Sequence, residues 1–418
     1  MLVETIFDRN QATTQFAVRA LNGTVSLSSS LDLPTGERLV PYSPTNNLLA
    51  TGCVLLPSEV GAFESKASLL DDIRAYLHSY VDLSPLFEDI AAHYVLLTWV
   101  YDAFNELPYL RFRGEYGTGK TRALMTIGSI CYKPFFASGA STVSPIFHIL
   151  DTFAGTLILD EADFRFSDAT ADLTKILNNG NARGFPVLRT MTNKHQELNP
   201  RAFRVYGPKI IGMRESFADK ALESRFLTEN TGNRIVRTDI PIHQPDSLHE
   251  DALRLRNQLL AWRFRARHEV GPDLSRVIAG VEPRRNQTAL ALLSLIDDAA
   301  LRERIGHELV GEEARVLHER AATPEATVLA CLRDAFLGPV AVFVTVTEVT
   351  RRFNERMAQE LGAMMTPKWV GGLIRTKLRL ETMKTRGVYV VPCSERSKID
   401  ALARRYGLPP LSTSDPVQ

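Results

Sequence analysis

The chain has 418 residues, of which 44% are hydrophobic and 23% charged, and its formal net charge is +1. This composition predicts a globular protein of roughly two to four domains. No stretch reaches the roughly 18 apolar residues of a membrane span and no secretion-signal pattern is evident, so we expect a cytoplasmic protein without membrane contact. The four cysteines are widely spaced and lack C-x-x-C spacing, so they indicate neither a zinc site nor a disulfide framework: Cys53, Cys131, Cys331 and Cys393.

The first part of the chain is predicted to change from strands to helices. Residues 1–65 contain short β-type stretches (15–20, 24–27 and 48–56) between prolines and glycines, which predict a small β-rich N-terminal module. From 68 to 107 the apolar residues recur at helical spacing. We therefore expect two or three helices that lead into a nucleotide-binding strand.

A phosphate-binding loop is predicted at residues 114–121, where Gly-Glu-Tyr-Gly-Thr-Gly-Lys-Thr fits G-x-x-x-x-G-K-[ST] at each fixed position. The glycines let several backbone N–H groups point at one anion, Lys120 adds a positive charge at the terminal phosphates, and the Thr121 hydroxyl can hold Mg²⁺. The alternative is a glycine-rich turn from a strand into a helix. We predict ATP binding by Gly114, Gly117, Thr118, Gly119, Lys120 and Thr121.

Two adjacent carboxylates support this prediction. Residues 156–160 form a short apolar run, read as a buried strand, that ends in Asp160 and Glu161. In a parallel sheet this strand and the strand before the loop end at the same edge, where ligands bind. Asp160 is then expected to hold Mg²⁺ and Glu161 to polarise the attacking water. The alternative is an acidic, solvated start of a helix.

Alternating strands and helices to about residue 240 predict an α/β core with a parallel sheet, residues 66–240. A proline-containing linker follows at 241–245. Helical spacing from Ser247 onward then predicts an all-helical lid over residues 241–322.

The C-terminal segment concentrates positive charge, because residues 345–410 hold 13 Lys and Arg against six Asp and Glu. Within 323–410 the predicted order is helix, helix, strand pair and helix, which is the layout of a winged helix. The alternative is a small helical cap with a solvated basic face. We expect residues 411–418 to be a disordered tail. Duplex DNA is predicted to contact Lys368, Arg375, Lys377, Lys384 and Arg386.

A β-hairpin is predicted just before a core strand, from two extended runs (185–192 and 201–206) around the turn Asn193-Lys194-His195-Gln196. A hairpin at this place resembles that of the pre-sensor-1 hairpin clade of AAA+ ATPases, which includes superfamily 3 and MCM helicases. The resemblance implies that Lys194 and His195 contact the phosphates of single-stranded DNA in a ring's central channel. The alternative is an ordinary exposed hairpin with a basic turn.

Two further features belong to this resemblance. Leu222-Glu223-Ser224-Arg225-Phe226 is similar to the AAA+ box that supplies an arginine finger, so Arg225 is implied to reach the γ-phosphate held by a neighbouring subunit. A structural arginine at a helix end is the alternative. Arg284 or Arg285 is implied to be a second sensor, without a choice between them. The viral helicases place Asn after the hairpin strand, whereas this chain has Arg214 nearby, so the first sensor is not assigned.

These features predict an ATP-driven, ring-forming DNA helicase, with a hexamer as the expected assembly and ATP and Mg²⁺ as cofactors. The closest resemblance is to replicative helicases of phages, plasmids and mobile elements, whose partners include single- and double-stranded DNA and replication proteins. One alternative is a helicase loader or DNA-bound assembly ATPase without processive unwinding. Another is a nucleotide-regulated DNA-binding protein.

Overall fold

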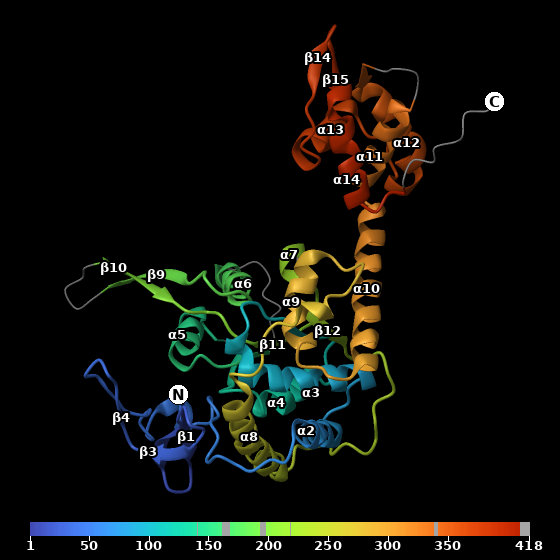
Figure 1. The fold of residues 1–418 in the computed structure, drawn as a ribbon. Helices are drawn as coiled ribbons and strands as arrows, with labels where there is room; N and C mark the ends of the chain where they lie inside the picture. The colour runs from blue at the N-terminus through green and yellow to red at the C-terminus, as the bar shows by residue number, and fades with distance from the viewer. Residues whose placement is uncertain (140, 161–167, 193–197, 218, 338–341, 410–418) are drawn as a thin grey trace. The chain divides into compact units, whose positions relative to one another are not determined.

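A computed structural model of the protein describes residues 1–139, 141–160, 168–192, 198–217, 219–337 and 342–409. They form two compact units, Met1–Gly306 and His307–Gln418 (Figure 1). None of the helices in these described ranges is long and apolar enough to cross a membrane.

The predicted parallel α/β sheet is confirmed in the first unit. Its five strands run in the order β12-β6-β11-β8-β7, and each adjacent pair is parallel. Their side chains are largely buried, which explains the near-continuous apolar runs of the sequence. The strands are β6 (Tyr109–Arg113), β7 (Phe135–Ser138), β8 (Leu157–Asp160), β11 (Lys209–Met213) and β12 (Phe226–Asn230).

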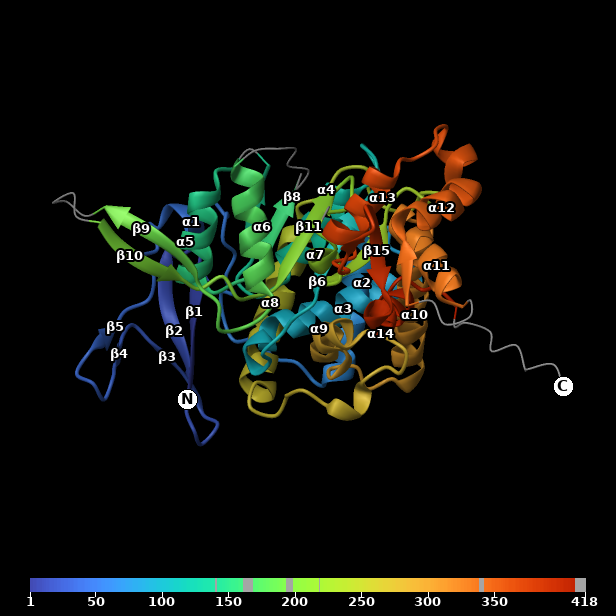
Figure 2. The ribbon, with the colours of Figure 1, turned by 90° about the horizontal axis from the view of Figure 1, so that it is seen from above.

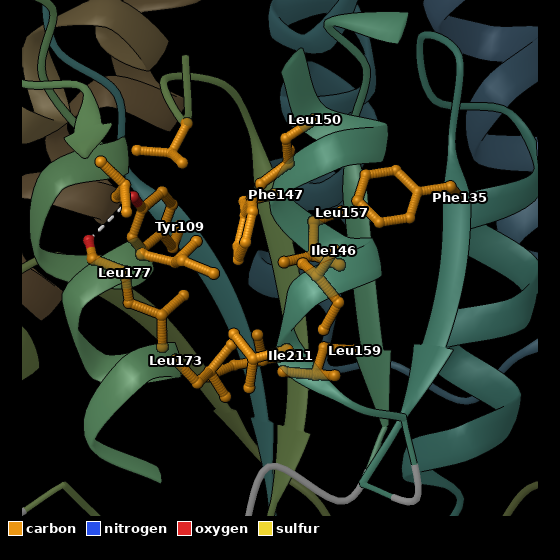
Figure 3. Packing of buried hydrophobic residues seen from close by; sticks show 14 of the residues in the cluster. Tyr109, Phe135, Ile146, Phe147, Leu150, Leu157, Leu159, Leu173, Leu177 and Ile211 are labelled. Atoms are coloured by element: carbon orange, nitrogen blue, oxygen red, sulfur yellow. Dashed lines mark hydrogen bonds between the residues drawn. The ribbon is translucent and has the colours of Figure 1, made fainter. Parts of the chain in front are cut away.

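Helices cover both faces of this sheet, and α6 lies on one side of β8 and β11 while α4 lies on the other (Figure 2). On the α6 side, apolar side chains of the sheet interdigitate with those of α5 and α6 (Figure 3). The helices of the core are α2 (Lys66–Tyr80), α3 (Pro85–Val100), α4 (Lys120–Ser129), α5 (Val143–Phe153), α6 (Asp168–Gly180) and α7 (Lys220–Glu223).

The N-terminal module is a three-stranded antiparallel sheet in the order β1-β2-β3, followed by the short pair β4 and β5. The strand expected at 48–56 was wrong, because the Asn46 side chain accepts a hydrogen bond from the backbone N–H of Leu48 and caps the short helix α1. The bounds are β1 (Leu2–Asp8), β2 (Thr13–Arg19), β3 (Val25–Ser28), β4 (Leu31–Asp32), β5 (Arg38–Leu39) and α1 (Asn47–Ala50).

A buried charge cluster fastens this module to the core. The carboxylate of Glu4, on β1, lies 2.9 Å from Lys133 Nζ and 2.6 Å from Arg263 Nε. The Tyr132 hydroxyl donates to the same carboxylate at 2.8 Å. Burial raises the pKa of Glu4, but Lys133 and Arg263 outweigh burial and hold the pKa below its ordinary value of 4.5. The first 65 residues are therefore an integral part of the first unit.

Helices follow the sheet, as predicted. Arg122 of α4 donates to the backbone oxygens of Pro241 and Ile242, which holds the predicted linker against the core. The chain passes from the first unit into the second at Gly306, inside a long helix. The helical bounds are α8 (Ser247–Ala266), α9 (Pro283–Leu293) and α10 (Ala299–Ala321).

The predicted hairpin is present just before β11. It consists of β9 (Val187–Thr192) and β10 (Leu198–Phe203), which pair in antiparallel register and extend beside α5 (Figure 1). Arg189 of β9 binds Asp172 of α6 at 2.6 Å, and Arg201 of β10 binds Asp151 of α5 at 3.4 Å. The arms of the hairpin are thus attached to the helices that flank the sheet.

The second unit contains the predicted helices and strand pair around its own apolar core. A short strand that we did not predict, β13, completes a three-stranded sheet in the order β13-β15-β14. The elements are α11 (Pro324–Phe336), β13 (Phe343–Thr345), α12 (Val346–Leu361), α13 (Pro367–Gly372), β14 (Met383–Thr385), β15 (Val388–Pro392) and α14 (Arg396–Arg405).

Candidate functional site

The loop between β6 and α4 has a backbone suited to phosphate binding. Gly117 and Gly119 have φ angles of 76° and 89°, in the left-handed region that glycine adopts without strain. A Cβ at either position would meet nothing within 4 Å, so glycine is needed for the turn and not for packing. Gly119 is the N-cap of α4 and has no side chain to cap it. The first N–H groups of α4 are therefore available to an anion.

Lys120 lies over this loop. Its Nζ donates to the backbone oxygens of Gly114 and Glu115, both at 2.7 Å. The Thr118 hydroxyl donates to the Glu115 oxygen at 2.8 Å and lies 2.8 Å from the hydroxyl of Thr231, just after β12. The loop is thus held in shape by its own lysine and threonine, with the ammonium group where terminal phosphates would be bound.

The two predicted nucleotide motifs meet at the carboxyl edge of the sheet. The Thr121 hydroxyl donates to Asp160 Oδ2 at 2.6 Å, although β6 and β8 are separated by β11. Hydroxyl and carboxylate oxygens are the hard ligands that Mg²⁺ prefers. Within the described ranges no group of three or more His, Cys, Asp or Glu could hold a metal. Thr121 and Asp160 therefore fit Mg²⁺ that takes its other ligands from phosphate and water.

Glu161, the predicted catalytic base, lies outside the described residues. It directly follows Asp160 in the sequence. Its role therefore stays a prediction.

Three polar side chains beside the loop were missed in the sequence. Arg113, the last residue of β6, donates to Asn230 Oδ1 at 3.0 Å and to the Ser216 hydroxyl at 2.5 Å. Ser216 follows β11 and Asn230 ends β12, so the group joins the carboxyl ends of three adjacent strands. The only sequence signal was the position of Arg113 directly before Gly114. This network occupies the place where a first sensor was expected but not assigned.

Arg225 lies at the amino edge of the sheet, opposite the phosphate-binding loop. Its backbone oxygen accepts from Tyr109, the first residue of β6. Its side chain is only 7% exposed and donates from Nη1 to the oxygen of Leu177 at 3.2 Å and to Asn178 Oδ1 at 2.5 Å. Burial lowers the pKa of Arg225, and the charge of Arg284 acts in the same direction. In this conformation Arg225 points into its own subunit, so a role as a finger requires the side chain to turn outward.

The proposed second sensor also lies away from the loop. Gln287 of α9 donates to Glu106, which precedes β6, at 2.5 Å. Burial raises the pKa of Glu106, and the nearby charge of Arg284 opposes that shift. Arg284 is exposed and Arg285 is buried. The structure therefore places Arg284 near the amino edge, away from the phosphate-binding loop of its own chain.

Lys209 is a buried cation that sequence reasoning did not single out. Its Nζ donates to the backbone oxygens of Gly180, Val205 and Gly207 at 3.2, 2.9 and 2.9 Å. Burial, together with the charge of Arg225, lowers its pKa to about 7. Lys209 thus connects the end of α6, the return from the hairpin and the start of β11. Its apolar neighbours in the sequence gave no signal for this role.

The basic residues predicted to bind DNA are described only in part. Lys194 and His195 fall outside the described residues, between the two arms of the hairpin. In the second unit, all five predicted side chains are exposed: Lys368, Arg375, Lys377, Lys384 and Arg386. They lie on α13, on the helical turn Leu373–Lys377 that continues it, and on the hairpin of β14 and β15.

The sheet order, the loop before α4 and the acidic end of β8 together define an α/β P-loop core. No protein-family model and no curated protein matches the sequence. The SCCmec type IV Cch active helicase is 13% identical, with a TM-score of 0.41 over 95% of this chain and 94% of that one. The apo C-terminal region of NrS-1 is 12% identical, with a TM-score of 0.38 over 93% and 96%.

A DNA-bound Orc1 protein from Aeropyrum pernix is also similar, at 15% identity and a TM-score of 0.22 over 78% of this chain and 94% of that one. The low identities and TM-scores assign no activity to this chain. Its activity therefore has to be inferred from the site.

Proposed function

We propose that this chain is an AAA+ ATPase that forms a ring, hydrolyses ATP at the interfaces between subunits and uses the energy to move along and unwind DNA. The observation that carries the proposal is the contact of 2.6 Å between Thr121 and Asp160 beside the uncapped start of α4. If the loop after β6 were only a glycine-rich turn and the end of β8 only a solvated helix start, these two motifs would have no need to meet at one edge of the sheet.

Each residue of the nucleotide site has a defined task in this proposal. The N–H groups of the loop and the Lys120 ammonium bind the phosphates, and Thr121 and Asp160 hold the metal ion. Mg²⁺, when bound, supplies positive charge that stabilises the negative charge developing on the phosphates. Glu161 accepts a proton from the attacking water. Arg113 holds the side chains of Asn230 and Ser216 in position at the strand ends beside the loop.

The geometry supports a shared site. Arg225 and Arg284 lie at the edge of the sheet away from their own loop, so neither can serve the nucleotide of its own chain without a large movement. In a ring this edge would face the nucleotide of the next subunit. Both arginines would then act on that nucleotide, and hydrolysis would depend on assembly.

The hairpin of β9 and β10 is the proposed DNA-contacting element of the central channel, with Lys194 and His195 at its tip. Its base is connected to the core through Lys209, which bonds the return segment and α6. The exposed cations of the second unit would add contacts to duplex phosphates in the manner of a winged helix. With these contacts the chain would act as a DNA helicase, and the proposal that it serves the replication of a mobile element rests on the resemblance of the sequence.

The inward position of Arg225 favours one alternative, a loader or assembly ATPase. Such a protein would use ATP to release Arg225 and change its oligomeric state, without moving processively. Both functions require ATP hydrolysis at the phosphate-binding loop. DNA-stimulated ATP turnover, with Lys120→Ala as the control, tests this requirement. Loss of turnover in Lys120→Ala is expected, and strand displacement on forked DNA then separates a helicase from a loader.

A further inference from the structure

The second unit holds an arginine and a tyrosine in a fixed pair on its exposed face. Arg375, in the turn after α13, places its guanidinium carbon 5.4 Å from the ring centre of Tyr389 on β15. Lys384 of β14 lies directly opposite Tyr389 in the strand pair, so the two side chains share a face. α13 and this hairpin lie next to each other (Figure 1). We call Arg375, Lys384 and Tyr389 the Tyr389 surface.

Helix α13, which ends just before the turn that carries Arg375, leaves space for this pair. A Cβ at Gly371 would lie 3.2 Å from Arg375 Nη1, so glycine leaves space for the guanidinium group. A Cβ at Gly372 would meet nothing within 4 Å, so packing does not require glycine there. Each glycine costs the helix about 1 kcal/mol relative to alanine. The chain then forms a π-helical turn, Leu373–Lys377, a feature that is frequent at functional sites.

Two aromatic side chains of the second unit, one on α13 and one on β15, are exposed although the unit has its own apolar core. Tyr389 is 51% exposed and Trp369 is 39% exposed, whereas Val370 and Val390 beside them are fully buried. Trp369 packs on Phe353 with ring centres 5.6 Å apart, so its position is fixed from within. Contacts to phosphates require only cations and donors, and they give no reason to expose these rings.

A surface that combines an exposed aromatic ring with cations fits single-stranded nucleic acid, because unpaired bases offer a free π-face for stacking. In an intact duplex the bases stack on one another and offer only their edges. Lys368, Lys377 and Arg386 are also exposed on this unit, and their positive charges complement the phosphates of such a strand. We propose that the Tyr389 surface binds unpaired DNA bases, such as those at a fork next to a duplex, by stacking on Tyr389 with Arg375 as its support.

This inference rests on the proposed DNA-binding role of the second unit. The test uses the full chain with Lys194→Ala, so that the proposed channel contact does not contribute. Fluorescence anisotropy measures binding to a short single strand, a blunt duplex and a fork. Tyr389→Ala is compared with Tyr389→Phe, which keeps the ring, and with Val388→Ala, which removes an exposed apolar neighbour. Lys384→Ala removes a cation from the same face.

Tyr389→Ala should weaken binding to the single strand and the fork by about 5- to 150-fold, the range for losing one stacked base, and leave the duplex within about twofold. Tyr389→Phe and Val388→Ala should bind like the parent. The salt slope should stay unchanged in Tyr389→Ala and fall by about 0.7 on the single strand in Lys384→Ala.

Two results would overturn the inference while leaving DNA binding by this unit intact. One is a weaker complex only in Lys384→Ala, which would mean that the surface binds phosphates alone. The other is an equal loss on duplex and single strand in Tyr389→Ala. If neither variant weakens binding to any of the three DNAs, the DNA-binding role proposed for this unit fails as well. Circular dichroism melting checks that each variant is folded.

Discussion

Arg225 binds the end of α6 in the structure, and we propose that it contacts the nucleotide of a neighbouring subunit in a ring. In the structure it donates to the carboxyl end of α6, where cations are favoured by the exposed carbonyl oxygens. Its Nε is buried without a hydrogen-bond partner among the described residues. The inward position therefore leaves one donor unsatisfied, which lowers the cost of turning the side chain toward a neighbouring nucleotide.

Arg225→Ala should abolish ATP hydrolysis while nucleotide affinity is kept, because the guanidinium group acts across an interface. Mixing provides the check. Adding a Lys120→Ala subunit, which keeps Arg225 but lacks a working loop, should restore part of the turnover in mixed rings. Full turnover by Arg225→Ala alone would show that the site is not shared.

Glu161→Gln should leave ATP binding intact and lower turnover by about two orders of magnitude, because the carboxylate acts on the attacking water. Turnover and nucleotide affinity are measured on the same preparation. Glu115→Gln, in the phosphate-binding loop but not assigned to chemistry, is the control. Hydrolysis by Glu161→Gln at the parental rate would remove Glu161 from the mechanism.

The buried carboxylate of Glu4 gives a pH-dependent prediction. Because its folded pKa lies below its ordinary value of 4.5, the unfolded chain binds the proton more readily, so the stability gained is present above that value and is lost as the pH falls through the folded pKa. Glu4→Gln should lower the free energy of unfolding by about 3–5 kcal/mol near pH 7.

Unfolding in urea, measured near neutral pH and again below 4.5, checks this prediction. The difference between Glu4→Gln and the parent should shrink at the lower pH. Glu37→Gln, an exposed carboxylate of the same module, should have little effect at either pH. An undiminished difference at low pH would mean that packing, and not charge, explains the loss.

Among the elements, the hairpin of β9 and β10 has a largely exposed second strand. Large apolar side chains on its outer arms, Leu188 and Leu198, remain exposed, and ion pairs to α5 and α6 hold its inner face. An isolated two-stranded hairpin is marginally stable in water. Its attachment to flanking helices is therefore what allows it to extend.

Lys194→Ala should abolish unwinding of forked DNA and DNA stimulation of hydrolysis, while duplex binding by the second unit is retained. The reason is that it removes a contact made only inside an assembled ring. Lys175→Ala, an exposed cation on α6, is the matched control and should unwind like the parent. Parental unwinding by Lys194→Ala would make the hairpin a structural insertion and favour the loader.

The elements also show what could be predicted from the sequence. The strands before Gly114 and Asp160, the hairpin and the helices of the second unit carry local patterns of apolar residues and turn signals. Strand β1 was missed because its buried Glu4 breaks the apolar pattern, and its partners Lys133 and Arg263 lie far along the chain. Contacts between distant segments leave no local signal.

The same limit applies to the site. Lys120, Thr121 and Asp160 were predicted because a motif fixes their spacing and chemistry. The inward side chain of Arg225 and the location of Arg284 depend on which edge of the sheet each segment reaches, and only the folded chain shows that. Arg113 and Ser216 meet because β6 and β11 are neighbours in the sheet, an order that the sequence alone does not reveal.

At the scale of the whole molecule, the nucleotide site and the basic surface lie in different units. The first unit carries the phosphate-binding loop, the arginines of the opposite edge and the hairpin. The second carries the Tyr389 surface. A helicase needs both ATP hydrolysis and contact with DNA. We therefore expect ATP turnover in the first unit to separate DNA strands.

Strand displacement on a labelled fork shows whether ATP hydrolysis drives strand separation. The parent chain with ATP is compared with Lys120→Ala and with the parent in a non-hydrolysable ATP analogue. We expect displacement by the parent with ATP, and none with the analogue or with Lys120→Ala. If the parent hydrolyses ATP and binds the fork but displaces no strand, the chain is not a helicase. An assembly ATPase would then be the favoured function.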